Sequence, residues 1–518
     1  MAERRAEISA PLVLALFFVL AALSIAPLFW VLLPPLNDYP NHLARMHILA
    51  DLGKSADLQR FYRNVMLVQP NLAMDLIVPA LTTFMPLQIA GKAFIGLTAV
   101  LTAAGTLALH YSIHRRWSIW PLIAFFFVFH RMMLWGLLNF CFGIGVMLVG
   151  LAVWIAIRNW PVFPRILIST ACAIAIYVSH LYAFGIYAIA LGGIELWFLF
   201  SSTPLRVKAT NIAAAGVQFL LPVYFFLYLG GTAATVSETR WGTVWRKFEA
   251  PFDVIYQYHL TFDIACLLLL CALFGWGLWK RRISVDSRLL ATLGLLAVTF
   301  LAMPDELFTG YGADRRLPIA IVLILVAASD WQPKRIPWKE PAVLLVAALF
   351  IVRTAILADV WNRSNAVYSQ YFAAFNEVPR GAKILPYTLQ PETRSLQAIP
   401  LLEGACLGIV LRDAFVPSLF TSPPLSAESV SFAPSVRELG LRTHFHIQRG
   451  HDVAAIHERK EVSVPRVFQN DILSQFDYVF ITRPDALRSG MVPKELKAVY
   501  RGSTFVLLKV PHALRAQP

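Results

Sequence analysis

A polar stretch just after the first long apolar segment holds three side chains that can do chemistry. It runs Pro34-Pro-Leu-Asn-Asp-Tyr-Pro-Asn-His-Leu-Ala-Arg and contains Asp38, His42 and Arg45. If the chain turns helical after Pro40, these three side chains converge near the start of that helix. Asp38 can then serve as a general base on a hydroxyl group, His42 can orient it or share its proton, and Arg45 can hold a phosphate. The alternative is an ordinary helix start, in which Asp38 is the N-cap and the other two lie on the helix surface.

Metal binding is a further option for two of these side chains. Asp38 and His42 can together ligate a divalent metal, so the sequence leaves the cofactor undecided. His444 and His446 alternate along a short stretch and could share one face of a strand. They have no cysteine and no close carboxylate beside them, and an exposed strand explains them better than a metal site.

A second polar stretch precedes a late apolar segment and contains Asp314, Arg315 and Arg316 within Pro304-Asp-Glu-Leu-Phe-Thr-Gly-Tyr-Gly-Ala-Asp-Arg-Arg-Leu-Pro. Its glycines allow the backbone to approach a ligand closely. Two adjacent arginines at the mouth of an apolar segment can bind a phosphate or pyrophosphate through paired hydrogen bonds. The alternative is that both arginines extend toward the membrane surface without binding anything.

Three further polar sites interrupt apolar segments. His130 and Arg131 lie between two such segments, and His180 lies at the break between two others. For these residues, lining a polar cavity and making structural hydrogen bonds are both open, and we count them as candidate substrate-binding residues. Asn139 is better explained as a polar contact between packed helices.

The amino-acid composition indicates the class of fold that positions these residues. The chain has 518 residues, of which 58% are hydrophobic and 15% charged. Soluble proteins carry roughly 25% charged residues, so the apolar surplus predicts a surface that faces lipid. The net charge of +14 does not indicate a nucleic-acid partner, because the basic residues lie in short clusters between apolar runs. That distribution is typical of cytoplasmic loops in membrane proteins.

The apolar runs predict a polytopic α-helical membrane protein of about eleven spans with a cytoplasmic N-terminus. The first run is too long for a cleavable signal peptide, so we expect it to stay as a span. Residues 72–86 are apolar but do not fit this count, and they predict a re-entrant or interfacial helix. The predicted spans are residues 11–33, 88–110, 118–130, 133–157, 165–180, 182–201, 209–229, 263–279, 287–303, 317–329 and 341–358.

The chain changes character at residue 359. Charges become frequent, and three short strands are predicted at Lys383-Ile-Leu-Pro, Phe476-Asp-Tyr-Val-Phe-Ile and Thr504-Phe-Val-Leu-Leu-Lys-Val. Val436-Arg-Glu-Leu and Pro493-Lys-Glu-Leu-Lys are predicted to be helical. We therefore expect a membrane domain over residues 1–358 and a small extracytoplasmic α/β domain over residues 359–518. No P-loop, GxGxxG or GxSxG motif occurs, which disfavours an ATP-driven pump and a soluble-type hydrolase.

The membrane part resembles the GT-C superfamily of membrane glycosyltransferases, which use polyprenyl-phosphate sugars. The resemblance rests on Asp38-Tyr-Pro-Asn-His-Leu-Ala-Arg, Gly136-Leu-Leu-Asn-Phe and Asp314-Arg-Arg-Leu-Pro. It covers residues 1–358 and is, more narrowly, a resemblance to poorly characterised bacterial members. Many relatives have a pair of acidic residues in or near the first outer loop, whereas Asp38 has no adjacent acid.

The resemblance implies a role for each motif. Asp38 would deprotonate the acceptor, His42 would support it, and Arg315 or Arg316 would hold the phosphate of the lipid donor. The reaction would take place on the outer face of the bacterial cytoplasmic membrane, with membrane lipid and a polyprenyl-phosphate sugar as partners. A lipid or solute transporter, a flippase and a non-catalytic assembly subunit remain alternatives.

Overall fold

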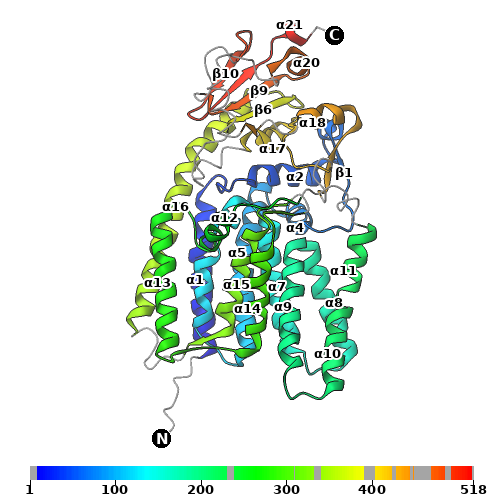
Figure 1. Ribbon diagram of the computed structural model, residues 1–518. Helices are drawn as coiled ribbons and strands as arrows, with labels where there is room; N and C mark the ends of the chain where they lie inside the picture. Colours follow the sequence, from blue (N-terminus) through cyan, green and yellow to red (C-terminus); the bar gives the residue numbers. More distant parts are fainter. Residues whose placement is uncertain are drawn as a thin grey trace. The chain divides into compact units, whose positions relative to one another are not determined.

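The computed structural model describes residues 9–229, 239–307, 310–331, 340–389, 403–422, 428–443, 447–448, 468–484 and 492–515. The chain forms two compact units, each built from separated segments (Figure 1). The helical unit comprises Met1–Pro27, Leu67–Met74 and Phe94–Ala358. The α/β unit comprises Leu28–Met66, Asp75–Ala93 and Asp359–Pro518.

Eight helical segments in the described part of the chain are long and apolar enough to cross a membrane. They are α1 (Ala10–Trp30), α5 (Leu87–His114), α7 (Leu138–Ala156), α8 (Val162–Ser179), α9 (Leu181–Leu199), the composite Leu205–Leu229, α13 (Leu260–Trp279) and α16 (Pro341–Asn376). Shorter apolar helices cover Trp120–Trp135, Ser287–Ala302 and α15 (Leu317–Ala328). Each of the eleven predicted spans corresponds to one of these segments, and the predicted class of polytopic helical membrane protein is confirmed.

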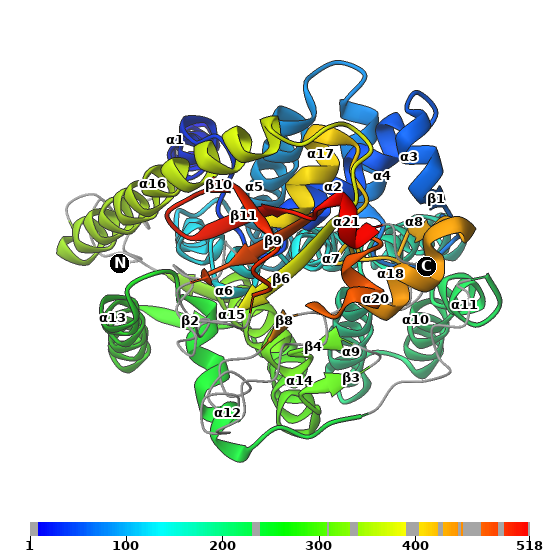
Figure 2. The same cartoon turned by 90° about the horizontal axis from the view of Figure 1, so that it is seen from above.

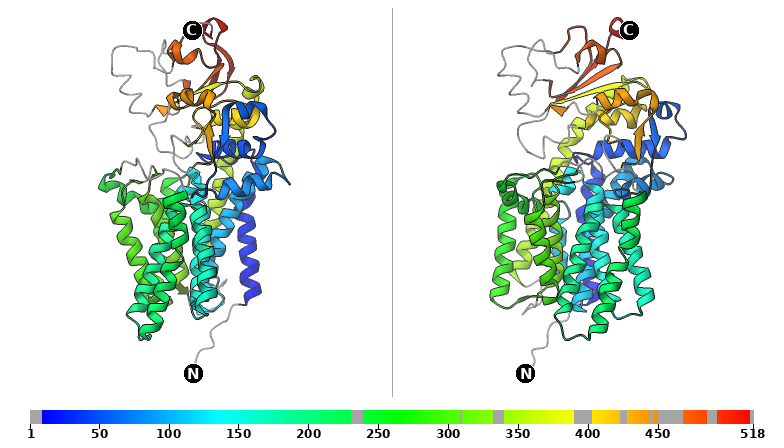
Figure 3. Two further views of the ribbon diagram at one scale, coloured as in Figure 1. Left: turned by 90° about the vertical axis from the view of Figure 1, so that its right-hand side faces the viewer. Right: turned by 45° about the vertical axis from the view of Figure 1, so that its right-hand side comes forward.

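The helices of the helical unit run side by side (Figure 3), and small residues bring some of them together. A Cβ atom added at Gly193 of α9 would lie 2.4 Å from the Cα atom of Thr292 in α14 (Leu290–Ala302). One added at Gly145 of α7 would lie 3.1 Å from the backbone nitrogen of Thr102 in α5. Close backbone approach of this kind stabilises helix pairs where lipid offers no hydrophobic driving force.

Two of the predicted spans are irregular. Residues 118–130 form a 3-10 helix, η1 (Trp120–Phe127), followed by the short helix α6 (Arg131–Trp135). The predicted span 209–229 is divided into α10 (Leu205–Val217), α11 (Leu220–Tyr224) and the π-helix η2 (Phe225–Leu229). Pro222 explains the break before α11, because proline lacks an N–H and its ring clashes with the carbonyl of residue 218.

Helix α16 is longer than predicted. It has 36 residues and continues past residue 358 to Asn376. The extension is helical because Trp361, Tyr368, Tyr371 and Phe375 recur at helical spacing and are all buried. In the α/β unit, the Tyr371 ring lies 4.6 Å from the Phe505 ring, so the extension packs on the sheet.

The α/β unit is built on a five-stranded sheet of order β10-β11-β9-β6-β8 (Figure 2). Its strands are β6 (Ile384–Leu389), β8 (Ile447–Gln448), β9 (Tyr478–Thr482), β10 (Lys497–Arg501) and β11 (Phe505–Lys509). Strand β6 pairs in parallel with β8 and β9, and β11 pairs antiparallel with β9 and β10. The short helices beside the sheet are η8 (Gly404–Cys406), α17 (Leu407–Arg412), η9 (Pro434–Val436), α18 (Arg437–Thr443), α20 (Asn470–Leu473) and α21 (His512–Arg515).

The three predicted strands match β6, β9 and β11, and the helix predicted at Val436 matches α18. The helix predicted at Pro493 is wrong: the chain makes a turn there and enters strand β10 at Lys497. A five-residue stretch is too short for helical propensity to outweigh pairing with a neighbouring strand. His444 and His446 lie outside the described residues.

Segments from the N-terminal third complete the α/β unit. They form α2 (Tyr39–Asp51), α3 (Ala56–Phe61) and strand β1 (Tyr62–Asn64), and α4 (Ala73–Leu81) enters the unit at Asp75. Strand β1 pairs antiparallel with β7 (Val430–Phe432), with Tyr62 opposite Phe432. The stretch that carries Asp38 is therefore packed with the C-terminal part of the chain.

Candidate functional site

Asp38 occupies the N-cap position of α2. Its side chain makes no capping hydrogen bond to the helix. Instead, the amide nitrogen of Asn37 donates a 2.7 Å hydrogen bond to its Oδ1. The side chain is only half-buried, whereas Tyr39 and Asn41 beside it are fully buried. Asp38 is therefore an oriented carboxylate at a helix start, near the positive end of the helix dipole.

His42 lies one helical turn after Asp38, and Arg45 controls its hydrogen bonding. A terminal nitrogen of the Arg45 guanidinium lies 3.4 Å from Nδ1 of His42. A guanidinium can only donate, so Nδ1 acts as the acceptor and the neutral ring carries its proton on Nε2. The predicted convergence of Asp38, His42 and Arg45 on the first turns of one helix agrees with this geometry.

Arg45 itself is held by carboxylates rather than presented to a ligand. Its side chain is 1% exposed, and its Nε and one terminal nitrogen bind the two oxygens of Asp75 at 2.7 and 3.1 Å. Its other terminal nitrogen binds Glu428, and the hydroxyl of Ser429 donates to Asp75. The same ion pair explains how Asp75 is accommodated in the apolar stretch 72–86.

A buried acid beside the α2 helix escaped the sequence analysis. The amide nitrogen of Asn41 donates to Glu403 at 3.0 Å, and the Cys406 sulfur lies 3.7 Å from the same carboxyl oxygen. Burial raises the pKa of Glu403 to about 7, although the hydrogen bonds from Asn41 and Cys406 oppose this shift. Nothing in the local sequence could reveal this contact, because it joins residues that are 362 positions apart.

The second candidate region lies in the helical unit, and there Arg315 is bound by acidic residues. Its guanidinium donates to Asp253 at 2.6 Å and to Glu249 at 3.1 Å. Arg131 also approaches Asp253, at 3.3 Å. Glu249 ends helix α12 (Val244–Glu249) and Asp253 lies in η3 (Ala250–Val254), so these pairs fasten the two elements to η5 (Asp314–Arg316).

Asp314 takes part in the same network of ion pairs. Its carboxylate lies 2.9 Å from the ammonium group of Lys247, and Arg246 beside it binds Asp305 at 2.5 Å. Both cations come from α12, whose Trp245 and Phe248 are exposed on the helix surface. Asp314 therefore attaches an apolar surface helix to the loop that carries the two arginines.

Arg316 has a different environment from Arg315. One of its terminal nitrogens lies 3.1 Å from Nε2 of His180, and its guanidinium lies 4.3 Å from the centre of the Tyr182 ring. His180 is also the N-cap of α9, where its Nδ1 accepts the backbone N–H of Tyr182 at 3.0 Å. Arg316 and His180 are both buried, being 5% and 7% exposed.

A neutral His180 cannot accept hydrogen bonds from both the N–H of Tyr182 and the guanidinium of Arg316. If Nδ1 of a neutral His180 accepts from Tyr182, then Nε2 carries the proton and faces a guanidinium that also only donates. If Nε2 accepts from Arg316 instead, the N–H of Tyr182 loses its acceptor. An oxygen that accepts from both Arg316 and His180 would remove the conflict, and an anionic oxygen would do so best.

His130 caps the start of a short helix. It is the N-cap of α6, where its Nδ1 accepts the backbone N–H of Met132 at 3.3 Å. Its Nε2 lies 3.9 Å from the sulfur of Cys141. Asn139 of α7 accepts the backbone N–H of Met74 at 2.8 Å, and Met74 lies in the first turn of helix α4, so Asn139 makes the polar contact between helices that the sequence predicts.

Metal ligands do not gather in the part of the chain that the structure covers. There, no group of three or more histidine, cysteine, aspartate or glutamate residues is arranged to hold a metal ion.

Comparisons with known proteins give a structural resemblance only. No family model matches the sequence, and no curated protein matches it. Among solved structures, the crystal structure of ArnT from Cupriavidus metallidurans bound to undecaprenyl phosphate is similar over 98% of this chain and 100% of that chain, at 12% identity and a TM-score of 0.45. The apo form of the same protein matches over 98% of this chain and 99% of that chain, at 13% identity and a TM-score of 0.45. ArnT is a GT-C glycosyltransferase, the type that the sequence resembles. At this identity and score, the likeness assigns neither a residue role nor a substrate.

Replacing Arg45 tests whether its ion pairs support the fold. Arg45→Ala leaves Asp75 and Glu428 as buried charges without their cation, and we expect it to lower the free energy of unfolding by about 3–5 kcal/mol. The measurement is the melting temperature of the purified protein. Arg63→Ala, which removes an exposed arginine from the same unit, is the matched control. If both variants had the same melting temperature, the ion pairs of Arg45 would not be what stabilises the fold.

The raised pKa of Glu403 should make the stability of the folded protein depend on pH. This pKa is about 7 in the folded chain, whereas the ordinary pKa of a glutamate is 4.5, so the folded protein keeps a proton between these values that the unfolded chain loses. Stability should therefore fall by up to about 1.4 kcal/mol per pH unit as pH rises from 4.5 to 7.

Glu403→Gln should flatten this dependence, and Glu438→Gln, at an exposed position, should preserve it. Melting curves of the three proteins across this pH range provide the measurement. If the melting temperature of Glu403→Gln depended on pH as strongly as that of the unchanged protein, Glu403 would not be the cause of the dependence.

Proposed function

We propose that this protein is a membrane glycosyltransferase that transfers a sugar from a polyprenyl-phosphate donor to an acceptor. The reaction takes place on the outer face of the bacterial cytoplasmic membrane. In this proposal the N-terminus is cytoplasmic, residues 1–358 form the membrane domain, and residues 359–518 lie outside. The opposed donors of Arg316 and His180 are the observation that carries the proposal.

Arg316 and His180 have the chemistry of a phosphate site. A terminal nitrogen of Arg316 lies 3.1 Å from Nε2 of His180, and both side chains are buried. They lie at the starts of two apolar helices, because Arg316 is the N-cap of α15 and His180 is the N-cap of α9. Helix starts and buried cations favour an anion, and a phosphate carried on a lipid could approach such a position from within the membrane.

Asp38 supplies the second requirement, which is a base. In the proposed reaction, the acceptor hydroxyl attacks the anomeric carbon of the sugar while Asp38 takes its proton. The bond from the anomeric carbon to the phosphate oxygen breaks, and the polyprenyl phosphate leaves. Hydrogen bonds from Arg316 and His180 stabilise the charge that develops on this leaving group.

The other candidate residues act as supports in this proposal. The Arg45 guanidinium contacts Nδ1 of His42, and His42 in turn orients Asp38 or the acceptor. Arg131, Asp314 and Arg315 hold the loops beside Arg316 through their ion pairs. The role of Arg45 thereby changes from phosphate ligand to positioning residue, because two carboxylates already neutralise its charge.

Asp38→Asn tests the base. It keeps the size of the side chain and removes its basicity, so we expect the transfer rate to fall by a factor of about 10²–10⁴. Transfer from a radiolabelled polyprenyl-phosphate sugar by purified protein in lipid vesicles is the measurement. Asp51→Asn changes the other end of the same helix and should leave the rate near that of the unchanged protein. Full activity of Asp38→Asn would contradict the assignment.

Arg316→Gln and Arg315→Gln separate phosphate binding from structural support. Loss of a hydrogen bond to a charged group costs about 1.5–3 kcal/mol, so Arg316→Gln should raise the KM for the donor about 10–100-fold. Its melting temperature should fall less than that of Arg315→Gln. Arg315→Gln should instead lower the melting temperature, because Asp253 and Glu249 lose their partner. The reverse pattern would assign the phosphate to Arg315.

A further inference from the structure

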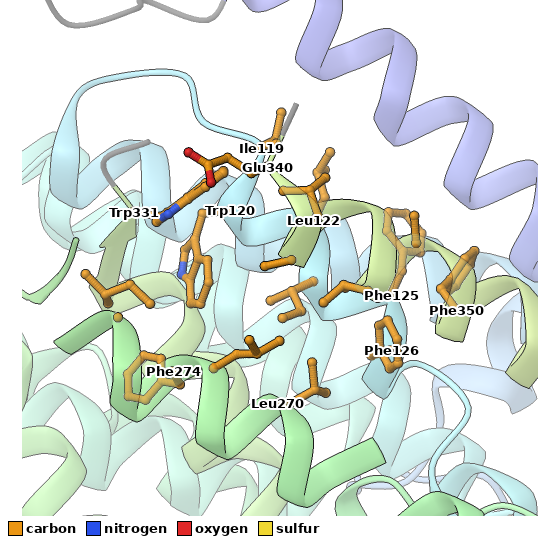
Figure 4. Close-up of a pocket in the computed structure, with 18 of the residues that line it drawn as sticks. Ile119, Trp120, Leu122, Phe125, Phe126, Leu270, Phe274, Trp331, Glu340 and Phe350 are labelled. Carbon is orange, nitrogen blue, oxygen red and sulfur yellow. The ribbon is translucent and has the colours of Figure 1, made fainter. Parts of the chain in front are cut away.

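A cavity lies in the helical unit, away from the Arg316–His180 pair. It has a volume of about 300 Å³ and lies among α1, η1, α13 and α16 (Figure 4). This volume is at the lower end of the range for ligand pockets in proteins. Aromatic side chains form much of its wall, namely Trp120, Phe125, Phe126, Phe274, Trp276 and Phe350.

The cavity opens on the side of the helical unit. Val19 of α1 and Trp276 of α13 both line it, and they are 55% and 43% exposed. All four surrounding elements belong to apolar segments of the chain. A ligand therefore enters from the hydrocarbon of the membrane, and it must be apolar along most of its length.

One end of the cavity is charged. Arg282 and Glu340 line it there, and they form a loose ion pair of 3.7 Å. Trp331 lies beside them on strand β5 (Ser329–Trp331), which pairs with β2 (Ile283–Val285). Tryptophan and arginine at the end of an apolar span are typical of the level of the lipid headgroups.

Three consecutive cations follow α13 at this end of the cavity. Lys280 lies 3.9 Å from the centre of the Trp279 ring, and the guanidinium of Arg282 lies 5.0 Å from that of Trp276. Arg281 stands between them and is exposed. Clusters of basic residues beside a transmembrane helix bind anionic lipid headgroups.

We propose that this cavity is a binding site for an anionic membrane phospholipid. One hydrocarbon chain occupies the aromatic cavity, and the headgroup phosphate contacts Lys280, Arg281 and Arg282. The charged rim identifies a lipid that is anionic, and the aromatic walls and lateral opening identify a hydrocarbon chain as the occupant.

The site is separate from the proposed phosphate site of the sugar donor. Arg316 is at the N-terminal end of α15, and Trp331 of the cavity lies beyond its C-terminal end. Helix α15 has 12 residues, so these ends are about 18 Å apart. A headgroup at Arg282 is therefore not the phosphate held by Arg316.

Lipid retention by the purified full-length protein tests the proposal. Native mass spectrometry counts the bound lipids after incubation with phosphatidylglycerol or phosphatidylcholine in detergent. We expect one phosphatidylglycerol to be retained per chain and less phosphatidylcholine. Ala347→Trp fills the cavity and should abolish retention of both lipids, and Val343→Phe should reduce it. Val298→Trp, at an exposed position of α14 away from the cavity, is the control and should retain the lipid.

Neutralising Lys280, Arg281 and Arg282 together to Gln should remove the preference for phosphatidylglycerol while chain binding persists. Equal retention in Ala347→Trp, Val343→Phe and the unchanged protein would overturn the proposal. It would also fail if undecaprenyl phosphate displaced the bound phosphatidylglycerol and Arg316→Gln abolished that displacement, because the cavity would then belong to the donor site. Loss of transfer activity in Asp38→Asn has no bearing on lipid retention, so the two proposals fail independently.

Discussion

The helical unit depends on one constraint, which is that a charge packed among apolar helices must meet a partner of opposite sign. Arg353 of α16 binds Asp263 of α13, and Arg158 binds Glu195 of α9. Arg116 binds Asp330 beyond the C-terminal end of α15. Each pair joins segments that are distant in sequence, so the pairs fix which helices are neighbours. Apolar packing alone leaves this choice open, since lipid-facing helices gain little from contact with one another.

The proposed phosphate site at Arg316 and His180 follows from the same constraint. A histidine that caps a helix with Nδ1 cannot also accept a hydrogen bond at Nε2 while it stays neutral, so its partner arginine is matched with a donor. Neighbouring Arg315 binds two carboxylates. In the proposed mechanism these adjacent residues have different roles, which follow from the side chains around them and not from their residue type.

Sequence reasoning located the apolar segments well, because a run of twenty apolar residues has few alternatives. It stopped α16 at residue 358, since the apolar run ends there while the helical spacing of Trp361, Tyr368 and Tyr371 continues. It also brought Asp38, His42 and Arg45 together correctly, since they are neighbours on one helix. It could not find Glu403 or Glu428, because these acids reach α2 from more than 360 residues away. The choice between Arg315 and Arg316 likewise depended on residues from other elements.

The C-terminal segment acquires a specific role from these distant contacts. Asn41 of α2 donates to Glu403 and to the carbonyl of Ser418, Arg45 binds Glu428, and His47 binds Asp413 at 2.8 Å. These contacts recur along successive turns of α2, so the helix is held along its length by Glu403, Asp413, Ser418 and Glu428. The proposed base lies at the start of this helix, and a fixed helix supports that proposal, because small displacements of a base cost much of its effect. The C-terminal part of the chain is therefore best understood as the support of the helix that carries Asp38, and its sheet as the rigid base for that support.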